Sequence, residues 1–169
     1  MSLNLIKVPI TKRTAVKNEV GEFIVDQILR SVSNATSPVA GKGAFKILNK
    51  EYADNQKGGN RKANLELDGD MLDALEFRTT SSGVSVGIFD EDEAKKGFNH
   101  NQGDTLPRRQ FIPESGESFK RSIQSGVNRI IKDSESDPSI KDGGPVSTDI
   151  TVESLFGDIF ADLFGGANG

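Results

Sequence analysis

The chain has 169 residues with 18 Gly, 10 Phe, no Cys and no Trp, and its formal net charge is −4. This length suits one modest globular domain with an aliphatic and Phe-based core and many loops, and it excludes a large multidomain enzyme. The lack of Cys excludes disulfides, thiolate nucleophiles and Cys-ligated metal sites. The apolar run at the N-terminus is too short for a secretion signal, and no stretch approaches the roughly 20 residues of a membrane span. We therefore expect a soluble protein that assembles in a reducing cytoplasm and has no membrane partner.

The charge is unevenly distributed along the chain. Residues 133–169 carry eight acidic side chains and one basic side chain, a net charge of −7, so the first 132 residues carry +3. An acidic block of this kind is ordinarily a solvated tail. Neither part has the clustered, strongly basic face that is typical of a dedicated nucleic-acid-binding domain.

The N-terminal third predicts one long amphipathic helix over residues 13–33, because its apolar residues recur at spacings of three and four. These residues are Val16, Val20, Phe23, Ile24, Ile28 and Val32. Residues 34–44 and 54–64 combine Gly with polar side chains, which predicts two loops.

The middle of the chain predicts a helical turn followed by a β-hairpin. Asp68 or Asp70 can cap a short turn that buries the side chains of Met71, Leu72 and Leu75. Apolar and polar residues then alternate over 75–79 and again over 84–88, and Ser81-Ser82-Gly83 separates the two runs. This alternation is typical of two antiparallel strands that bury one face.

The next segments predict a short helix, an extended segment and a second long helix. Residues 90–103 begin with acidic side chains and end at Gly103, which indicates a helix or turn. Residues 106–113 are expected to be extended because they contain Pro107 and Pro113. A second amphipathic helix over 115–132, capped by Ser115 or Ser118, should pack on the sheet. Its apolar stripe consists of Phe119, Ile123, Val127, Ile130 and Ile131.

The C-terminal part predicts a tethered helix. Residues 133–148 are rich in Ser, Asp, Gly and Pro, which is typical of a flexible linker. Residues 149–169 contain a short amphipathic helix that is marginal in water alone, so it should fold when its apolar face is buried on a partner or on its own domain. That face consists of Leu155, Phe156, Ile159, Phe160, Leu163 and Phe164. The expected organisation is an α+β domain over 1–132, in which two long amphipathic helices pack on a small antiparallel sheet, followed by a C-terminal extension made of the linker 133–148 and a docking arm over 149–169.

Patterns that could carry catalysis have simpler structural interpretations. The only histidine, His100, would need carboxylate partners to bind a metal, and the nearest acidic run, Asp90 to Glu93, is more often a solvated turn. We expect the His100 ring to donate to nearby backbone instead. The acidic residues around Gly69 lack the ligand spacing of a calcium loop, and Gly41-Lys42-Gly43 lacks that of a phosphate-binding loop. We therefore expect no catalytic residue, no metal site and no cofactor, with a metal-dependent enzyme as the least favoured alternative.

An ordered set of short motifs over residues 13–132 resembles the phage virion morphogenesis family, which comprises the Mu G-like and related tail-completion proteins. After the first helix come an aromatic-x-x-Leu with a following Tyr, a Leu- and Gly-containing turn, a hairpin, an aromatic and His before Gly, and a Leu-Pro-x-Arg-x-Phe string. The matching residues are Phe45, Leu48, Tyr52, Leu65, Gly69, Met71, Leu75, Phe98, His100, Gly103, Leu106, Pro107, Arg109 and Phe111. Two positions depart from the family pattern: Ala74 replaces a frequent Ser, and Ile-Pro follows Phe111.

The resemblance implies a structural virion protein of a tailed phage, a neck or tail-completion subunit that forms a ring, commonly sixfold, at the head–tail junction. The implied partners are further copies of the chain, head connector or adaptor proteins, and tail tube or tail terminator proteins, with DNA passing through the lumen. The alternative is a minor tail or connector-associated protein that contacts nucleic acid. Arg109 is expected to form a bidentate pair with a carboxylate in the core or on the adjacent subunit, and Arg108 is a second candidate contact. The expected subunit or partner interface comprises Leu106, Pro107, Arg108, Arg109 and Phe111 together with the six apolar residues of the arm.

Overall fold

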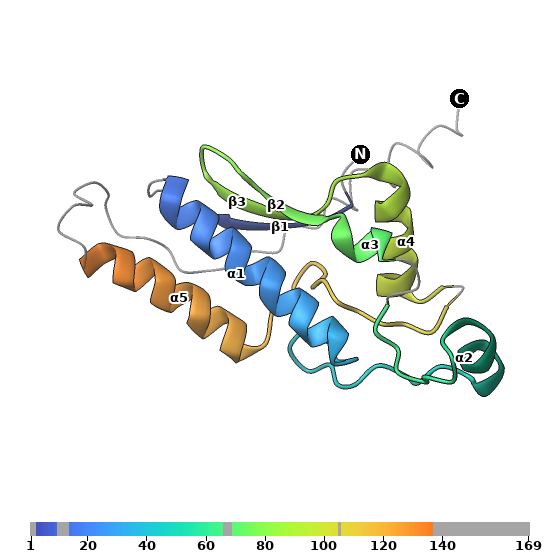
Figure 1. Cartoon of the computed structure of the whole chain (residues 1–169). Coiled ribbons are helices and arrows are strands. Elements are labelled where there is room, and N and C mark those ends of the chain that lie inside the picture. The colour runs from blue at the N-terminus through green and yellow to red at the C-terminus, as the bar shows by residue number, and fades with distance from the viewer. Residues whose placement is uncertain (1–2, 10–13, 66–68, 105, 137–169) are drawn as a thin grey trace, which may run out of the picture.

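A three-stranded antiparallel sheet is combined with helices in an α+β arrangement (Figure 1). The structure is a computed structural model, and it describes residues 3–9, 14–65, 69–104 and 106–136. The strands are β1 (Leu3–Pro9), β2 (Leu75–Thr79) and β3 (Gly83–Ile88), and they lie in the order β1-β3-β2. The helices are α1 (Thr14–Ser33), α2 (Lys50–Gln56), α3 (Asp70–Asp73), α4 (Glu91–Gln102) and α5 (Arg121–Ser136).

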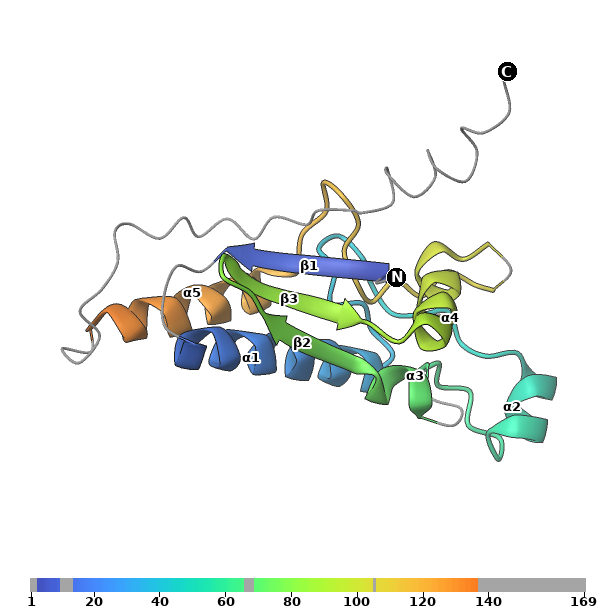
Figure 2. The same cartoon turned by 90° about the horizontal axis from the view of Figure 1, so that it is seen from above.

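The predicted hairpin is confirmed, but it forms only part of the sheet. Strands β2 and β3 pair antiparallel, with Leu75 opposite Ile88 and Phe77 opposite Val86. The sequence interpretation missed β1, which pairs with the other edge of β3, placing Lys7 opposite Ser85 (Figure 2). Because β3 is therefore the central strand, all six of its residues are buried, whereas the prediction had only one face of the hairpin buried. The alternating start Leu3-Asn4-Leu5 was the available signal for β1.

Helix α1 confirms the first predicted helix and packs on β2 and β3. Val20, Ile24, Ile28 and Val32 of its stripe are completely buried. Gly21 allows a close approach to the sheet, because a Cβ atom at this position would overlap the ring of Phe77 on β2. The apolar stripe of α1 thus faces the core, as its helical spacing predicts.

Helix α5 differs from the predicted second helix in its ends and in its packing. It begins at Arg121 and not near Ser115 or Ser118, because the backbone before it is bonded to the loop after α1. Phe119 forms a β-bridge with Val39, and Lys120 N donates to Pro38 O at 2.8 Å. The carbonyl of Ser118, which would accept the first hydrogen bond of a helix capped there, instead accepts from Ala40 N at 2.8 Å, so this backbone is not helical.

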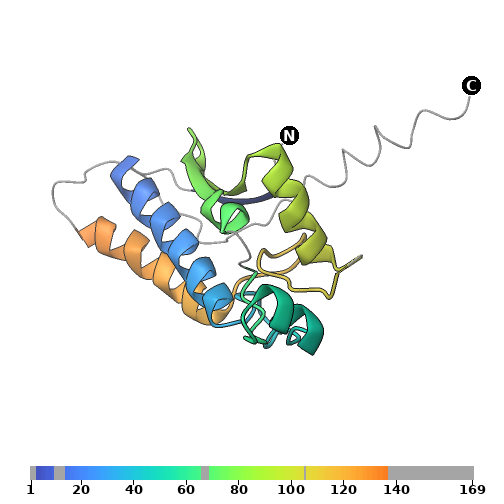
Figure 3. The ribbon, with the colours of Figure 1, turned by 45° about the vertical axis from the view of Figure 1, so that its right-hand side comes forward.

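The main neighbour of α5 is α1, and not the sheet as predicted (Figure 3). The two helices come close at Gly126, where a Cβ atom would overlap the ring of Phe23. Ile123, Val127, Ile130 and Ile131 of the predicted stripe lie on α5 and are buried in the common core. The fifth residue of that stripe, Phe119, is also buried but precedes the helix. The helix extends to Ser136, past the predicted boundary at residue 132.

The short helix α4 follows the prediction closely. The Asp90 carboxylate accepts hydrogen bonds from Asp92 N at 3.1 Å and Glu93 N at 3.0 Å, which caps the first turn. Gly103 ends the helix in the left-handed conformation, with φ of 79°, where Gly costs least. A side chain there would also collide with the backbone of Arg108, so Gly103 sets the return of the chain toward the 106–113 segment.

The structure corrects the predictions for two other short helices. Helix α3 buries Met71 and Leu72 as predicted, but Asp70 is its first residue and not its cap, and no side chain caps it. The other proposed cap, Asp68, lies outside the described residues. Helix α2 occupies the start of the predicted 54–64 loop, with Asn49 Oδ1 accepting from Tyr52 N at 2.7 Å.

Of the predicted C-terminal extension, the structure describes only residues 133–136. Residues 133–136, assigned to the linker, belong to α5. The remainder of the linker and the whole docking arm lie outside the described residues, including the six apolar positions proposed to bind a partner. These positions are Leu155, Phe156, Ile159, Phe160, Leu163 and Phe164.

Candidate binding cleft

A cleft of about 750 Å³ lies at the end of the molecule formed by α2, α3 and α4. Its walls come from residues 46–49 and 61–65, from Tyr52 and Lys57, from the start of α3, from α4 and from residues 106, 107 and 109. The cleft therefore joins segments that are up to 63 residues apart in sequence, as in the contact between Lys46 and Arg109. We call this site the cleft throughout.

The lining of the cleft is strongly cationic. One carboxylate, Asp70, belongs to the lining among the described residues. Six lining residues are Lys or Arg: Lys46, Lys57, Arg61, Lys62, Lys96 and Arg109. Such a concave surface with mainly positive charge attracts anionic groups.

The cleft also displays apolar side chains to solvent. Ile47, Tyr52 and Leu106 are 58%, 38% and 41% exposed, and they are the exposed large hydrophobic residues of the described part of the chain. All three line the cleft. An exposed apolar patch with a charged rim is typical of a surface that binds another macromolecule.

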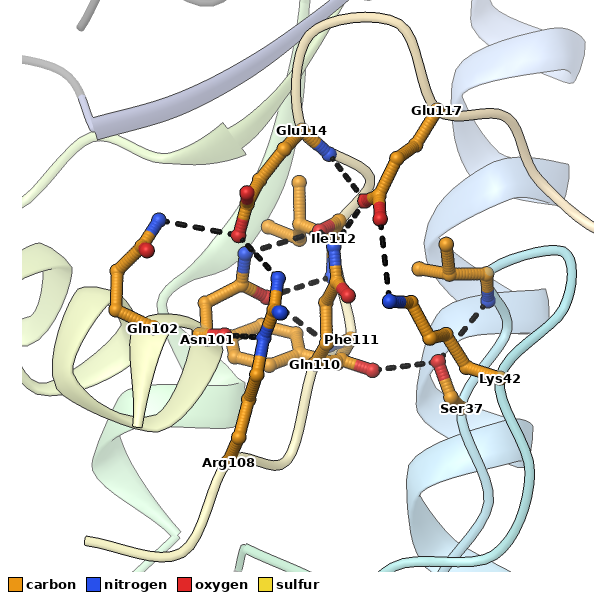
Figure 4. Close-up of polar contacts among 11 residues, drawn as sticks. Ser37, Lys42, Asn101, Gln102, Arg108, Gln110, Phe111, Ile112, Glu114 and Glu117 are labelled. Carbon is orange, nitrogen blue, oxygen red and sulfur yellow. Dashed lines mark hydrogen bonds and ion pairs between the residues drawn. The ribbon is translucent and has the colours of Figure 1, made fainter. Parts of the chain in front are cut away.

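The segment that forms one wall, residues 106–113, is anchored from behind by Asn101 of α4 (Figure 4). The buried Asn101 Oδ1 accepts from the backbone N atoms of Phe111 and Ile112, both at 3.0 Å, and Asn101 Nδ2 donates to Ile112 O at 3.0 Å. One side chain therefore satisfies three backbone groups of a segment that has no strand partner. Phe111 is fully buried beside Gly97, which completes the anchor.

A second set of polar contacts links the same segment to the neighbouring loops (Figure 4). Arg108 donates to Asn101 O at 3.0 Å and pairs with Glu114 at 2.8 Å. Glu117 accepts hydrogen bonds from Gln110 and from Glu114 N, and it pairs with Lys42 at 3.3 Å. Burial alone would raise the pKa of Glu117, but these donors stabilise its charged form and hold the pKa below its ordinary value.

Arg109 is the unusual residue of this wall. It is only 6% exposed, and its guanidinium has one long contact, from Nη2 to Lys46 O at 3.5 Å, while the buried Nε atom has no hydrogen-bond partner. Burial lowers the pKa of Arg109, although the group stays protonated. The expected carboxylate fork in the core is wrong for the described residues, because the neighbouring Arg108 takes Glu114 and Arg109 turns toward the cleft.

His100 lies beside Arg109 in the wall of the cleft, and it also has a buried side-chain nitrogen without a hydrogen-bond partner. Its Nδ1 atom is buried without a hydrogen bond, so the predicted donation to backbone is not made from this atom. The backbone carbonyl of His100 instead accepts from Arg109 N at 2.8 Å. Burial lowers the pKa of His100, and the positive charge of Arg109 lowers it further. Among the described residues, no group of three or more His, Asp and Glu side chains is placed to hold a metal ion.

The structure separates the predicted contact residues into two groups. Leu106, Pro107 and Arg109 line the cleft, whereas Arg108 joins the network behind it and Phe111 is in the core. Sequence reasoning missed Asn101, although its helical spacing from the buried Ala94 and Gly97 places it on the inner face of α4. It also missed the cationic lining, since those residues come from separate segments.

None of the described helices is long and apolar enough to cross a membrane. No protein-family model matches the chain, and neither a curated protein nor a solved structure matches it.

Proposed function

We propose that this chain is a structural virion protein of a tailed phage, a neck or tail-completion subunit that assembles into a ring at the head–tail junction. The observation that carries the proposal is the position of the residues that resemble the phage virion morphogenesis family. Nine of those 14 residues line the cleft. They are Leu48, Tyr52, Leu65, Gly69, Met71, His100, Leu106, Pro107 and Arg109. Motifs dispersed over about 60 residues of sequence thus converge on one exposed surface, as expected if their shared role is contact.

The chemistry of the cleft suits contact with protein. Exposed apolar side chains with surrounding cations supply the apolar centre and polar rim of a protein interface. A contact between this concave surface and a different surface of the next copy would be heterologous, and heterologous contacts close into rings when the rotation per subunit permits. The other partners under this proposal are the connector or adaptor on one side and the tail tube or tail terminator on the other.

The test uses the full-length chain and particles assembled without it. Purified protein imaged by negative stain should form closed rings, with a subunit number measured by native mass spectrometry. Particles made without the chain should separate into DNA-filled heads and unattached tails. Intact infectious particles lacking the chain would contradict the proposal, whatever the oligomeric state of the purified protein.

The cationic lining gives a second candidate some support, namely contact with DNA at the same junction. Phosphate contacts make binding strongly dependent on salt, with log K falling by about 0.9 per neutralised phosphate per tenfold rise in salt. Duplex DNA binding should then weaken steeply between low and physiological salt, and Lys46→Glu with Lys62→Glu should reduce the salt dependence. Salt-independent or undetectable binding would dispose of this candidate.

A further inference from the structure

The cleft contains cationic charge that the described part of the chain does not balance. Within the described residues, no ion pair joins a carboxylate to Lys46, Lys57, Arg61, Lys62 or Arg109. Arg109 is the most demanding of these residues because its guanidinium is buried and its Nε atom lacks a partner. A buried cation is normally paired with an anion. An anionic occupant of the cleft would supply the partner that Arg109 lacks among the described residues.

The exposed apolar residues further restrict the chemistry of that occupant. Ile47, Tyr52 and Leu106 would all lose contact with water if an apolar surface covered them. A free phosphate or a phosphate backbone could neutralise the cations but would not bury these three side chains. The occupant should therefore be both acidic and apolar, which describes an amphipathic acidic peptide.

The chain itself contains such a peptide. Residues 149–164 carry four acidic side chains and no basic one, and the four acids are interspersed with the apolar stripe that ends at Phe164. The acids are Asp149, Glu153, Asp158 and Asp162. Helix-in-groove recognition uses this combination of an apolar face and complementary charge.

The distance between the attachment point and the cleft favours docking between copies. Helix α5, which ends at Ser136, runs to the side of the molecule where α1 starts, whereas α2, α3 and α4 lie toward the other end of α1 (Figures 1 and 2). Residues in or next to these three helices line the cleft. The 20 residues of α1 alone span about 30 Å. A random coil of about 12 residues, the number from 137 to 148, has a typical end-to-end distance of about 20 Å and spans about 40 Å only when fully extended. Docking in the cleft of the same copy would therefore need a nearly extended chain, which favours docking on another copy.

We propose that the cleft binds the acidic amphipathic arm, residues 149–164, of a second copy of this chain, with the guanidinium of Arg109 donating hydrogen bonds to a carboxylate of that arm. This inference rests on the proposed self-assembly, because it supplies the contact between successive subunits. It makes the contact heterologous, from the arm of one copy to the cleft of the next, which is the type of contact that a ring requires. The expectation that Arg109 pairs with a carboxylate on the adjacent subunit then has a defined partner segment.

The absence of native Cys permits a direct test by disulfide cross-linking of the full-length chain. One variant carries Asn99→Cys in the exposed lining of the cleft, and the other carries Gly165→Cys directly after the arm. The two proteins carry tags of different size. Mild oxidation of their mixture should yield the mixed covalent dimer. The matched control replaces the cleft variant with Thr79→Cys, which is exposed at the hairpin end of the sheet, and should give only background cross-linking.

A charge exchange tests the chemistry of the same contact. Asp158→Lys with Asp162→Lys reverses the arm, and Lys46→Glu with Lys62→Glu reverses the cleft. Each pair, introduced into both cross-linking partners, should lower the rate of mixed-dimer formation about tenfold. Mixing arm-reversed with cleft-reversed chains should restore the rate, since each arm then meets a cleft of opposite charge on the other copy. An arm docked in its own cleft could not be rescued in this way.

Three results would overturn the inference. These are mixed-dimer yields no higher than the Thr79→Cys control, an exclusively intrachain link in a chain carrying both Asn99→Cys and Gly165→Cys, and cleft reversal that abolishes DNA binding without changing cross-linking. The outcome is separable from that of the proposed function. Cross-linking can succeed for a protein that is absent from the head–tail junction, and rings that form through another surface would leave the proposed function intact while refuting the arm.

Discussion

The two ends of the described domain are stabilised in different ways. Around α1, α5 and the sheet, stability comes from apolar packing, including two sites where a Phe ring lies directly on a helical Gly. Around the cleft, residues 106–113 have no regular secondary structure and depend on side-chain hydrogen bonds, chiefly from Asn101. The exposed large hydrophobic residues of the described part of the chain lie at the second end, where the buried Nε atom of Arg109 also has no hydrogen-bond partner. The difference supports the proposal that the first end is the structural support and that the second end, with the cleft, binds a partner.

The largest expected effect tests the polar anchor. Asn101→Leu removes the acceptor for two buried backbone N–H groups and the donor for one carbonyl. Each orphaned buried group costs about 1–3 kcal/mol, so we expect the free energy of unfolding to fall by about 3 kcal/mol or more in urea denaturation. Asn99→Leu makes the same exchange at an exposed position of α4 and should change it by less than about 0.5 kcal/mol. Equal losses for the two variants would show that the 106–113 segment does not depend on Asn101.

The next effect tests the apolar end. Gly21→Ala forces a methyl group into the Phe77 ring, and overpacking costs about 1–3 kcal/mol, against a gain of about 1 kcal/mol in helix propensity. We expect a net loss of about 1 kcal/mol, recovered in part by adding Phe77→Leu, which makes the two changes non-additive. Gly43→Ala, which adds its methyl group in open space, is the control and should not lower stability. Additive effects of the two changes would place Phe77 away from Gly21.

The neighbouring residues Arg108 and Arg109 allow a paired arginine to be compared with an arginine that has no ion pair among the described residues. Arg108→Met removes the ion pair with Glu114 and should lower the free energy of unfolding by about 1 kcal/mol. The effect is small because both side chains are partly exposed. Arg109→Met replaces a buried, unpaired cation with an apolar chain of similar length, so at monomeric dilution it should be neutral or stabilising by about 1 kcal/mol. Arg109→Met should nevertheless reduce assembly. A marked loss of monomer stability in Arg109→Met would mean that its charge is already balanced within the subunit.

The smallest effect is a pH dependence at the junction of α4 and the cleft. The pKa of His100 lies below its ordinary value of 6.5, so the folded state favours the neutral ring. The contribution of neutral His100 to the free energy of unfolding is fully present above about pH 6.5, and it is lost as the pH falls from 6.5 through the lowered pKa. The free energy of unfolding should therefore fall more between about pH 7.5 and about pH 5.5 in the parent protein than in the His100→Gln variant. An identical decline in both proteins would assign the effect to other groups.

Regular elements with strong local signals could be predicted from the sequence. The stripe of α1, the Gly103 stop of α4 and the β2–β3 hairpin are all confirmed. Each depends on contacts within one segment or between adjacent segments, where spacing and capping chemistry suffice. The strand β1 was missed because one short alternation of apolar and polar residues does not identify a strand by itself. The strand is defined by its pairing with the edge of β3.

The errors occur where long-range contacts compete with local preference. The start of α5 is displaced to Arg121 because the preceding backbone bonds to residues 38–40, which lie about 80 positions earlier in the chain. Among the described residues Arg109 has no carboxylate partner in the core, whereas Arg108 pairs with Glu114; which of the two adjacent arginines lines the cleft depends on the path of a segment held by Asn101. No local pattern encodes that choice.

The sequence by itself determined the α+β character, the helix and hairpin units, and the acidic, apolar C-terminal segment, because periodicity and composition are properties of contiguous residues. Only the tertiary structure decided that six cations and three exposed apolar residues from five separate segments line one cleft. Charge neutralisation and apolar burial depend on distance in space, and the chain sets those distances through the buried contacts of α4 with residues 106–113 and not through spacing along the sequence.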